Sequence, residues 1–288
     1  MPKIYSKEFW ISEWQSAADG SRFKSVYPDE KLCWNLSART YDLGMGNSVL
    51  RVQRVLDILV QLDFWSSAKR ILDVGSGTGS YAIPFALHGG IVDALDNSEE
   101  MNRVLLEKCA SEGVAGISIL AEDFLECALP DDSYGLVFGS MNPCLYNPES
   151  FMRMLALTRD VLIYIGIAGG GAGHGTREKS LAELITGSPA GHNGSNHIIY
   201  PLNLLLAMEL DPTVDYIPCD WVAEEAPEAA VTRLVGQYGH FRETCPDIDA
   251  IVSDYVARHT EHGKFTEQTS VTLGIVVCRK QSSGAQNE

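Results

Sequence analysis

Short apolar runs and longer amphipathic stretches alternate through the middle of the chain. The runs lack polar residues at every second place, which is typical of strands buried on both faces. They predict strands at residues 70–74, 91–96, 117–123, 134–140 and 161–167. The stretches around them repeat apolar residues three or four apart, which is typical of helices. They predict helices at residues 47–62, 80–88, 98–112 and 148–160.

The pattern resumes less regularly after residue 196. It predicts helices at residues 201–210, 227–238 and 248–259, and strands at residues 214–218 and 270–279. Strands that alternate with helices favour a parallel sheet covered on both faces. The prediction is therefore an α/β, Rossmann-like, doubly wound, mostly parallel seven-stranded sheet with helices on both faces. The part after residue 196 shows no separate core pattern, so we place all of residues 47–288 in one domain.

Three segments stand outside this alternation. Residues 1–46 are rich in aromatic side chains without a clear period and predict a helical cap packed on the main domain. Residues 168–196 form a glycine-rich insert with a short helical patch at residues 179–185. Loops of this length in a compact domain are usually lids or binding loops, and we expect a lid here. The polar residues 280–288 predict a flexible tail.

Composition and charge restrict the function. The 288 residues carry 22 Lys plus Arg against 38 Asp plus Glu, a formal net charge of −16. This balance disfavours nucleic acid and anionic membranes as partners, because both attract basic surfaces. Seven cysteines without a C-x-x-C pair indicate reduced thiols rather than disulfides or zinc. No signal peptide is evident and the longest apolar run, residues 161–168, is too short to span a bilayer, so we expect a soluble cytoplasmic protein.

The loop after the first predicted strand holds three glycines. "ILDVGSGTGS" places them at Gly75, Gly77 and Gly79, spaced as G-x-G-x-G. A dinucleotide-binding loop needs G-x-G-x-x-G, and its third glycine is replaced here by Ser80. Asp73 would also repel a pyrophosphate. The loop therefore predicts a nucleotide ligand other than NAD, and a nicotinamide-dependent oxidoreductase is disfavoured.

Three acidic residues fall at the ends of predicted strands, where ligands of open α/β sheets bind. Asp73 lies beside the glycine loop and suits a ligand that carries an ammonium and a sulfonium. Asp96 ends the second strand and has the acceptor oxygens for two ribose hydroxyls, whereas Asp123 suits the amine of an adenine that stacks on Phe124. The alternative for Asp96 and Asn97 is helix capping, because both precede a predicted helix. The glycine loop and Asp123 favour ligand binding over capping.

These residues carry a resemblance. "ILDVGSGTGSYAIPFAL", "VDALDNSEEM", "ILAEDF" and "LPDDSYGLVFGS", in this order over roughly residues 70–167, resemble a class I S-adenosylmethionine-dependent methyltransferase. Upstream, "WNLSARTYD" resembles an element that often precedes this core. Two departures are Gly135, where the family often has Asp, and "NPCLY", which only begins like the Asn-Pro-Pro-Tyr motif of amino-group methyltransferases. No acceptor specificity is therefore carried over.

The resemblance implies a set of cofactor-binding residues. Asp73 and the three glycines would frame the methionine part of S-adenosylmethionine, and Ser140 would lie near that end. The ribose and adenine would contact residues that follow the second and third strands, and an upstream tyrosine would cover the cofactor. The residues implied in these last roles are Asp96, Asn97, Asp123, Phe124 and Tyr41.

The chemistry that follows is in-line transfer of a methyl group, which needs alignment more than a dedicated base. If a base is used, His174 and His192 of the insert are the candidates, although solvated loop histidines are the more common case. No histidine spacing matches a compact metal motif. The charge favours a small-molecule acceptor. A protein side chain as the acceptor, and a silent nucleotide-binding protein of the same fold, stay open.

Overall fold

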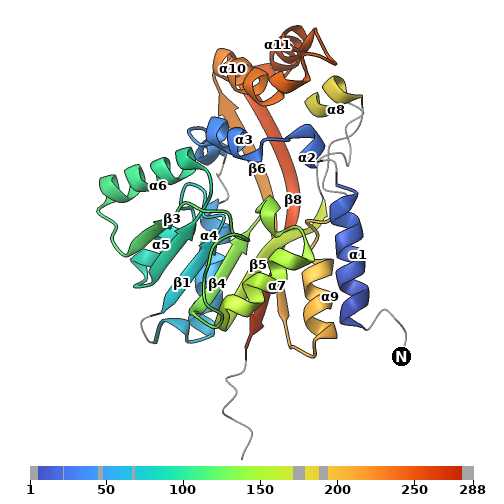
Figure 1. Cartoon of the computed structure of the whole chain (residues 1–288). Helices are drawn as coiled ribbons and strands as arrows, with labels where there is room; N and C mark the ends of the chain where they lie inside the picture. The colour runs from blue at the N-terminus through green and yellow to red at the C-terminus, as the bar shows by residue number, and fades with distance from the viewer. Residues whose placement is uncertain are drawn as a thin grey trace, which may run out of the picture.

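The computed structural model describes residues 6–21, 23–44, 48–66, 69–170, 179–187 and 194–280. Its centre is a sheet in the order β3-β2-β1-β4-β5-β8-β6, with the short β7 paired to β8 (Figure 1). Within the described residues every neighbouring pair is parallel except those that involve β8. The mostly parallel seven-stranded sheet is thus confirmed, with β7 as a two-residue addition. The strands are β1 (Arg70–Val74), β2 (Ile91–Leu95), β3 (Ile117–Leu120), β4 (Tyr134–Ser140), β5 (Thr158–Gly170), β6 (Thr213–Glu225), β7 (Thr260–Glu261) and β8 (Lys264–Arg279).

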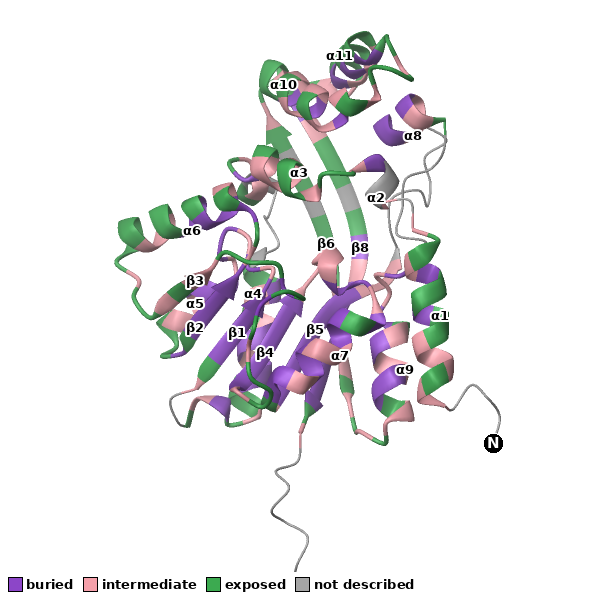
Figure 2. Cartoon of the chain, viewed as in Figure 1, coloured by how far each residue is buried: buried purple, intermediate pink, exposed green. Residues whose placement is uncertain are grey.

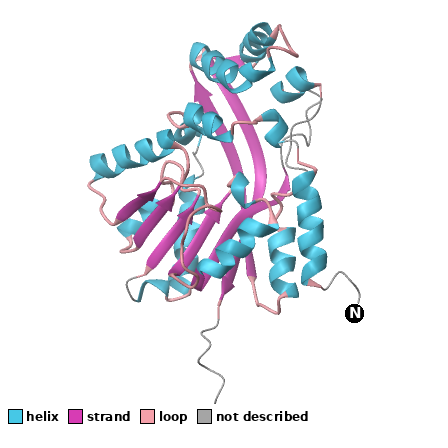
Figure 3. Cartoon of the chain, in the orientation of Figure 1, coloured by secondary structure: helices cyan, strands magenta, loops and turns pink. Residues whose placement is uncertain are grey.

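Helices cover both faces of the sheet (Figure 3). Successive side chains of a strand point to opposite faces, so Ile71 and Leu72 of β1 enter two different core clusters. The first cluster holds side chains of α4, α5 and α6, and the second holds those of α1, α7 and α9. The helices are α1 (Lys7–Asp19), α2 (Phe23–Val26), α3 (Glu30–Ser37), α4 (Ser48–Gln61), α5 (Ala82–Leu87), α6 (Glu99–Glu112), α7 (Pro148–Leu157), α8 (Leu181–Thr186), α9 (Ile199–Ala207), α10 (Pro227–Tyr238) and α11 (Ile248–Arg258).

The last two long strands differ from their prediction. β6 and β8 both extend past the body of the sheet as a two-stranded ribbon, in which Glu225 pairs with Phe265 (Figure 1). Most described residues of this ribbon are exposed (Figure 2). The sequence pattern missed these ends because their exposed positions carry acidic and amide side chains, which leave no continuous apolar run.

A separate small core lies at the far end of the ribbon. It joins buried residues of α8, α10, α11 and β8, among them Ile185, Leu234, Val252 and Phe265. The sequence shows no separate core pattern after residue 196, because this cluster combines α8, α10, α11 and β8 with Val26 of α2 and no continuous segment carries its pattern. The assignment of residues 47–288 to one domain stays a prediction.

The N-terminal segment divides between two places. α1 packs beside α9, and its Trp14 is fully buried and donates a hydrogen bond from Nε1 to the carbonyl of Ser195 at 2.8 Å. α3 instead packs on α6 and α10, above the carboxyl ends of the strands (Figure 1). Only this second part covers the functional edge of the sheet. The boundary at residue 46 stays a prediction.

The insert begins later than predicted. Residues 168–170 continue β5, because β8 provides a partner strand and Gly169 pairs with Thr272. α8 confirms the short helical patch. Residues 171–178 and 188–193 lie outside the described residues, and so do His174 and His192. The lid stays a prediction.

Candidate functional site

A cavity lies at the carboxyl ends of β1, β2 and β4, under α3 and the short helix η2 (Tyr41–Gly44). We call it the strand-end cavity. It contains about 660 Å³ of space, part of it open to solvent. Eight of the residues predicted as binding residues line it. They are Tyr41, Gly75, Gly77, Asp96, Asn97, Asp123, Phe124 and Ser140.

The glycine loop forms the floor of this cavity. Gly75, Gly77 and Gly79 all have positive φ angles, of 71°, 53° and 84°, which side chains with a Cβ rarely adopt. A Cβ on Gly75 would come within 1.6 Å of Nδ2 of Asn142, so this glycine makes room for that amide. A Cβ on Gly79 would meet Cδ1 of Leu105 at 2.2 Å. Gly79 therefore serves the packing of the loop on α6 and does not line the cavity.

Asp96 ties the glycine loop to the second strand. Its Oδ2 accepts the backbone N–H of Gly77 at 2.9 Å, and its Oδ1 accepts that of Ser98 at 2.8 Å. The cap of α6 is Ser98, whose Oγ accepts the N–H of Met101. Asp96 is thus not the helix cap. Each of its oxygens has accepting capacity left on the cavity side, and burial raises the pKa of its carboxyl.

Asp73 lies elsewhere. It is 2% exposed and is not part of the cavity wall. Burial, and then the nearby charge of Asp96, raise the pKa of its carboxyl to about 8, while a hydrogen bond from the backbone N–H of Ala82 acts in the other direction. Its Oδ2 has no hydrogen-bond partner among the described residues. The Asp73 carboxyl is therefore bound to the start of α5 and not exposed to the cavity.

Asp123, Phe124 and Asn97 lie at the ends of β3 and β2. Asp123 is exposed, and its Oδ1 accepts the N–H of Leu125 at 2.9 Å, which fixes the turn that follows the strand. Phe124 is buried at 3% exposure between this turn and the core. Ser140 ends β4 on the opposite side of the cavity. The three strand ends thus bring the predicted residues together.

Polar contacts of the neighbouring Asp42 hold Tyr41 over the glycine loop. The neighbouring Asp42 accepts a hydrogen bond from Oγ1 of Thr78 at 2.7 Å and pairs with Lys108 at 3.1 Å. Nζ of Lys108 also donates to the carbonyl of Thr78 at 2.8 Å. The ring of Tyr41 meets that of Trp34 edge to face at 6.3 Å. Burial raises the pKa of the Tyr41 phenol, which therefore stays neutral.

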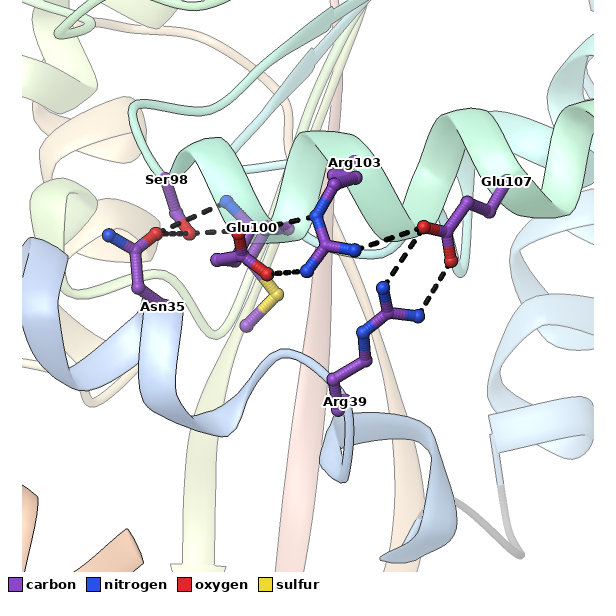
Figure 4. A network of polar contacts seen from close by, with 7 residues as sticks. Asn35, Arg39, Ser98, Glu100, Arg103 and Glu107 are labelled. Carbon is purple, nitrogen blue, oxygen red and sulfur yellow. Dashed lines mark hydrogen bonds and ion pairs between the residues drawn. The ribbon is translucent and has the colours of Figure 1, made fainter.

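A second polar network positions α3 on the first turns of α6 (Figure 4). Oδ1 of Asn35 accepts from Oγ of Ser98 at 2.7 Å and from the N–H of Glu100 at 3.2 Å. Arg39 forms a two-pronged ion pair with Glu107, which also pairs with Arg103. These contacts place Trp34, which precedes Asn35, in the cavity wall.

Sequence reasoning did not assign several lining residues. Four belong to "MNPC" after β4, where Oδ1 of Asn142 accepts the N–H of Cys144 at 3.1 Å and burial raises the pKa of the Cys144 thiol. The one signal for them was the partial Asn-Pro motif. The others reach the cavity by tertiary packing, and those that lie inside the quoted motifs were given no role of their own. The unassigned residues are Glu30, Trp34, Leu95, Met101, Glu122, Met141, Asn142, Pro143 and Cys144.

The strand-end cavity is acidic. Four carboxylates line it, those of Glu30, Asp96, Glu122 and Asp123, and no lysine or arginine is among the described residues that do so. Such a surface attracts cationic ligands and repels phosphates. The described residues contain no group of three or more His, Cys, Asp or Glu side chains placed to hold a metal ion.

His197 has a structural place beside the insert. Its Nε2 lies 3.1 Å from the carbonyl of Ala168 at the end of β5, and its Nδ1 accepts the N–H of Ile199 at 3.0 Å. The two contacts fasten the start of α9 to the end of β5. In the part of the chain that the structure describes, no helix has the length and apolarity needed to cross a membrane.

Comparison with known proteins agrees with this arrangement. Residues 71–164 match a family model described as a methyltransferase domain. No curated protein is significantly similar to the chain in sequence.

Two solved structures illustrate the similarity in fold. One is phosphoethanolamine N-methyltransferase 2 of Haemonchus contortus, with 17% identity over 75% of this chain and 49% of that one, and a TM-score of 0.45. The chain thus spans about half the length of that protein. The other is magnesium protoporphyrin IX methyltransferase of Synechocystis, with 16% identity over 82% of this chain and 85% of that one, and a TM-score of 0.46.

The family match covers β1 through most of β5, which includes the glycine loop, Asp96, Asp123, Ser140 and Asn142. The order of the strands and the antiparallel β8 complete the fold around it. Residues 71–164 of the chain therefore form a methyltransferase domain.

Proposed function

We propose that the protein binds S-adenosylmethionine in the strand-end cavity and transfers its methyl group to a small molecule. The observation that carries the proposal is the charge of the cavity: four carboxylates and no cationic side chain among its described lining residues. S-adenosylmethionine carries an ammonium and a sulfonium and has no phosphate, so this surface favours it. A dinucleotide would bring two phosphates to the same carboxylates.

Asp96 is the proposed ribose ligand. Its carboxylate is fixed by the N–H groups of Gly77 and Ser98, each of which occupies one accepting position. A carboxylate has about four such positions, so two remain for the ribose hydroxyls. Because both donors are backbone groups, the carboxylate is oriented before the ligand arrives, which lowers the entropy lost on binding.

The proposal assigns the adenine and methionine parts of the cofactor to two sides of the strand-end cavity, according to the other residues that line it. Asp123, Phe124 and Asn97 line the side of the cavity that the adenine would occupy, beyond β2 and β3. Gly75, Gly77, Ser140 and Tyr41 line the side for the methionine part. Asn142 joins this second group, because its amide approaches the loop only where Gly75 lacks a Cβ. Asp73 and Gly79 act through the loop that they support.

The bound cofactor supplies an electrophilic methyl group. The chain supplies alignment and the exclusion of water, which together account for much of the acceleration of such displacements. The described lining residues with titratable side chains are acids, the Tyr41 phenol and the Cys144 thiol, and burial raises the pKa of the last two. The proposal therefore assigns no dedicated base.

A small acceptor is supported by shape and charge. The cavity is covered by α3 and η2, which leaves little access for a large polymer. The net charge of −16 disfavours nucleic acid as the acceptor.

The test is transfer of an isotopically labelled methyl group from S-adenosylmethionine in a cell extract. We expect the label in the fraction of low molecular mass and not in protein or nucleic acid. Label in the protein fraction would contradict the choice of acceptor. No transfer to any fraction would favour a silent binding protein.

A further inference from the structure

A second cavity lies beyond the strand-end cavity, between α2, α3, α8, α10, α11 and β8. It contains about 990 Å³ of space, part of it open to solvent. We infer that this second cavity binds a small organic cation with an apolar body, beside the proposed cofactor site. The inference does not depend on methyl transfer and can be tested by binding alone.

The walls of the second cavity are aromatic. Phe23, Tyr27, Trp34, Tyr238 and Tyr255 all line it, although they come from four separate helical regions of the chain. The rings of Phe23 and Tyr27 lie 4.9 Å apart, and those of Tyr27 and Tyr238 lie 5.6 Å apart. The hydroxyls of these two tyrosines form a hydrogen bond of 2.5 Å, which fixes both rings. The faces of such rings attract organic cations.

The charge of the second cavity is negative. Its described charged lining residues are Arg233 and Glu267, which pair at 3.1 Å. The same guanidinium also pairs with the buried Glu225, so two carboxylates surround one cation. Burial opposes the charge of Arg233, but its contacts with Glu225 and Glu267 outweigh burial and raise its pKa. One negative charge is left over.

This balance decides the class of ligand. The guanidinium of Arg233 is occupied by the two glutamates and by Oε1 of Gln237 at 3.4 Å. An anion would have to break these pairs, which is costly for a buried arginine. Glu267 is the more exposed of the two glutamates, at 43% of its side chain against 9% for Glu225. An ammonium group among the rings can thus reach the carboxylate of Glu267. An anion would find the guanidinium of Arg233 already paired.

The two cavities share a wall. Trp34 lines both of them, and its ring contacts that of Tyr41 in the strand-end cavity. Nε2 of Gln237 donates to Oγ of Ser37 at 2.8 Å, which ties α10 to α3 next to this wall. A molecule in the second cavity therefore lies on the far side of one aromatic residue from the cofactor site.

The test measures binding of three probes of similar size to the purified protein by isothermal titration: benzyltrimethylammonium, benzyl alcohol and benzoate. We expect the cation to bind at least about tenfold more tightly than the other two, because only it gains both the ring faces and the carboxylate. Glu267→Gln keeps the shape of the side chain and should weaken binding of the cation about fivefold to tenfold. Glu228→Gln, on the exposed first turn of α10 and outside both cavities, should change nothing.

Binding of S-adenosylhomocysteine is measured on the same three proteins, and we expect it to be equal in all of them. Equal binding of benzyl alcohol or benzoate, or unchanged cation binding in Glu267→Gln, would overturn the inference while the proposed function stands. Absence of S-adenosylhomocysteine binding would instead overturn the proposed function, and the cation titration would still decide the nature of the second cavity.

Discussion

Two aspartates at the ends of neighbouring strands have opposite environments. Asp96 faces the strand-end cavity and its carboxylate is oriented by two backbone N–H groups. Asp73, at the end of β1, is closed off from solvent and its Oδ2 has no described partner. The sequence placed both beside the ligand on the same grounds. Burial separates their roles.

The raised pKa of Asp73 predicts a pH dependence of stability. The folded carboxyl keeps its proton up to a pH of about 8, whereas an unfolded one loses it near its ordinary value of 3.8. As the pH rises between these values, the carboxyl ionises in the unfolded state and not in the folded state. This ionisation stabilises the unfolded state. The free energy of unfolding therefore falls, by at most about 1.4 kcal/mol per pH unit, and levels off above pH 8.

The variant Asp73→Asn removes this titration and keeps the shape of the neutral acid. We expect it to match the parent protein near pH 5 and to become more stable than the parent as the pH approaches 8. Urea unfolding across this range measures the difference, with Asp247→Asn at an exposed position as the control. A difference that does not change with pH would mean that Asp73 is ionised in the folded protein.

At the scale of elements, the sequence predicted best where packing is local. The runs that form β1, β2 and β4 are buried on both faces, and their apolar composition was sufficient. The sequence pattern did not predict the ribbon ends of β6 and β8, because most of their described residues are exposed and many are polar. Trp34 and Asn142 reach the strand-end cavity through α3 and the turn after β4, and the motifs that contain them did not reveal these contacts.

The glycine loop and α6 form one packed unit, and this predicts unequal effects at two glycines. Gly79 and Gly113 both have positive φ angles, of 84° and 67°. A Cβ at Gly113 meets no atom within 4 Å, whereas one at Gly79 would meet Leu105 at 2.2 Å. Both alanine variants bear the backbone strain of roughly 1–2 kcal/mol, but Gly79→Ala also overpacks the core.

We expect Gly79→Ala to be less stable than Gly113→Ala by a further ~1–3 kcal/mol. Chemical unfolding of the two variants and the parent protein provides the comparison. Equal losses would show that Leu105 moves aside freely, and that Gly79 is needed only for its backbone angle.

At the scale of the whole molecule, the same sheet carries two hollow regions of different construction. The strand-end cavity is built from strand ends and their turns, which the sequence motifs mark. The second cavity is built from helices before, within and after the insert, around a core that no continuous segment predicts. The common element is α3, whose residues the sequence placed in an aromatic cap and, from Trp34 on, in an element that often precedes the methyltransferase core. The charge of both cavities agrees with the net charge of −16.

The measurement that tests the account most directly is the titration of the parent protein and of Asp96→Ala with S-adenosylhomocysteine and with NAD. We expect micromolar binding of S-adenosylhomocysteine by the parent protein and far weaker binding of NAD. Asp96→Ala should bind S-adenosylhomocysteine roughly tenfold to a hundredfold more weakly, because charge-assisted hydrogen bonds contribute about 1.5–3 kcal/mol each. A circular dichroism spectrum of the variant like that of the parent would exclude unfolding as the cause. Tighter binding of NAD than of S-adenosylhomocysteine, or unchanged binding in the folded variant, would contradict the account.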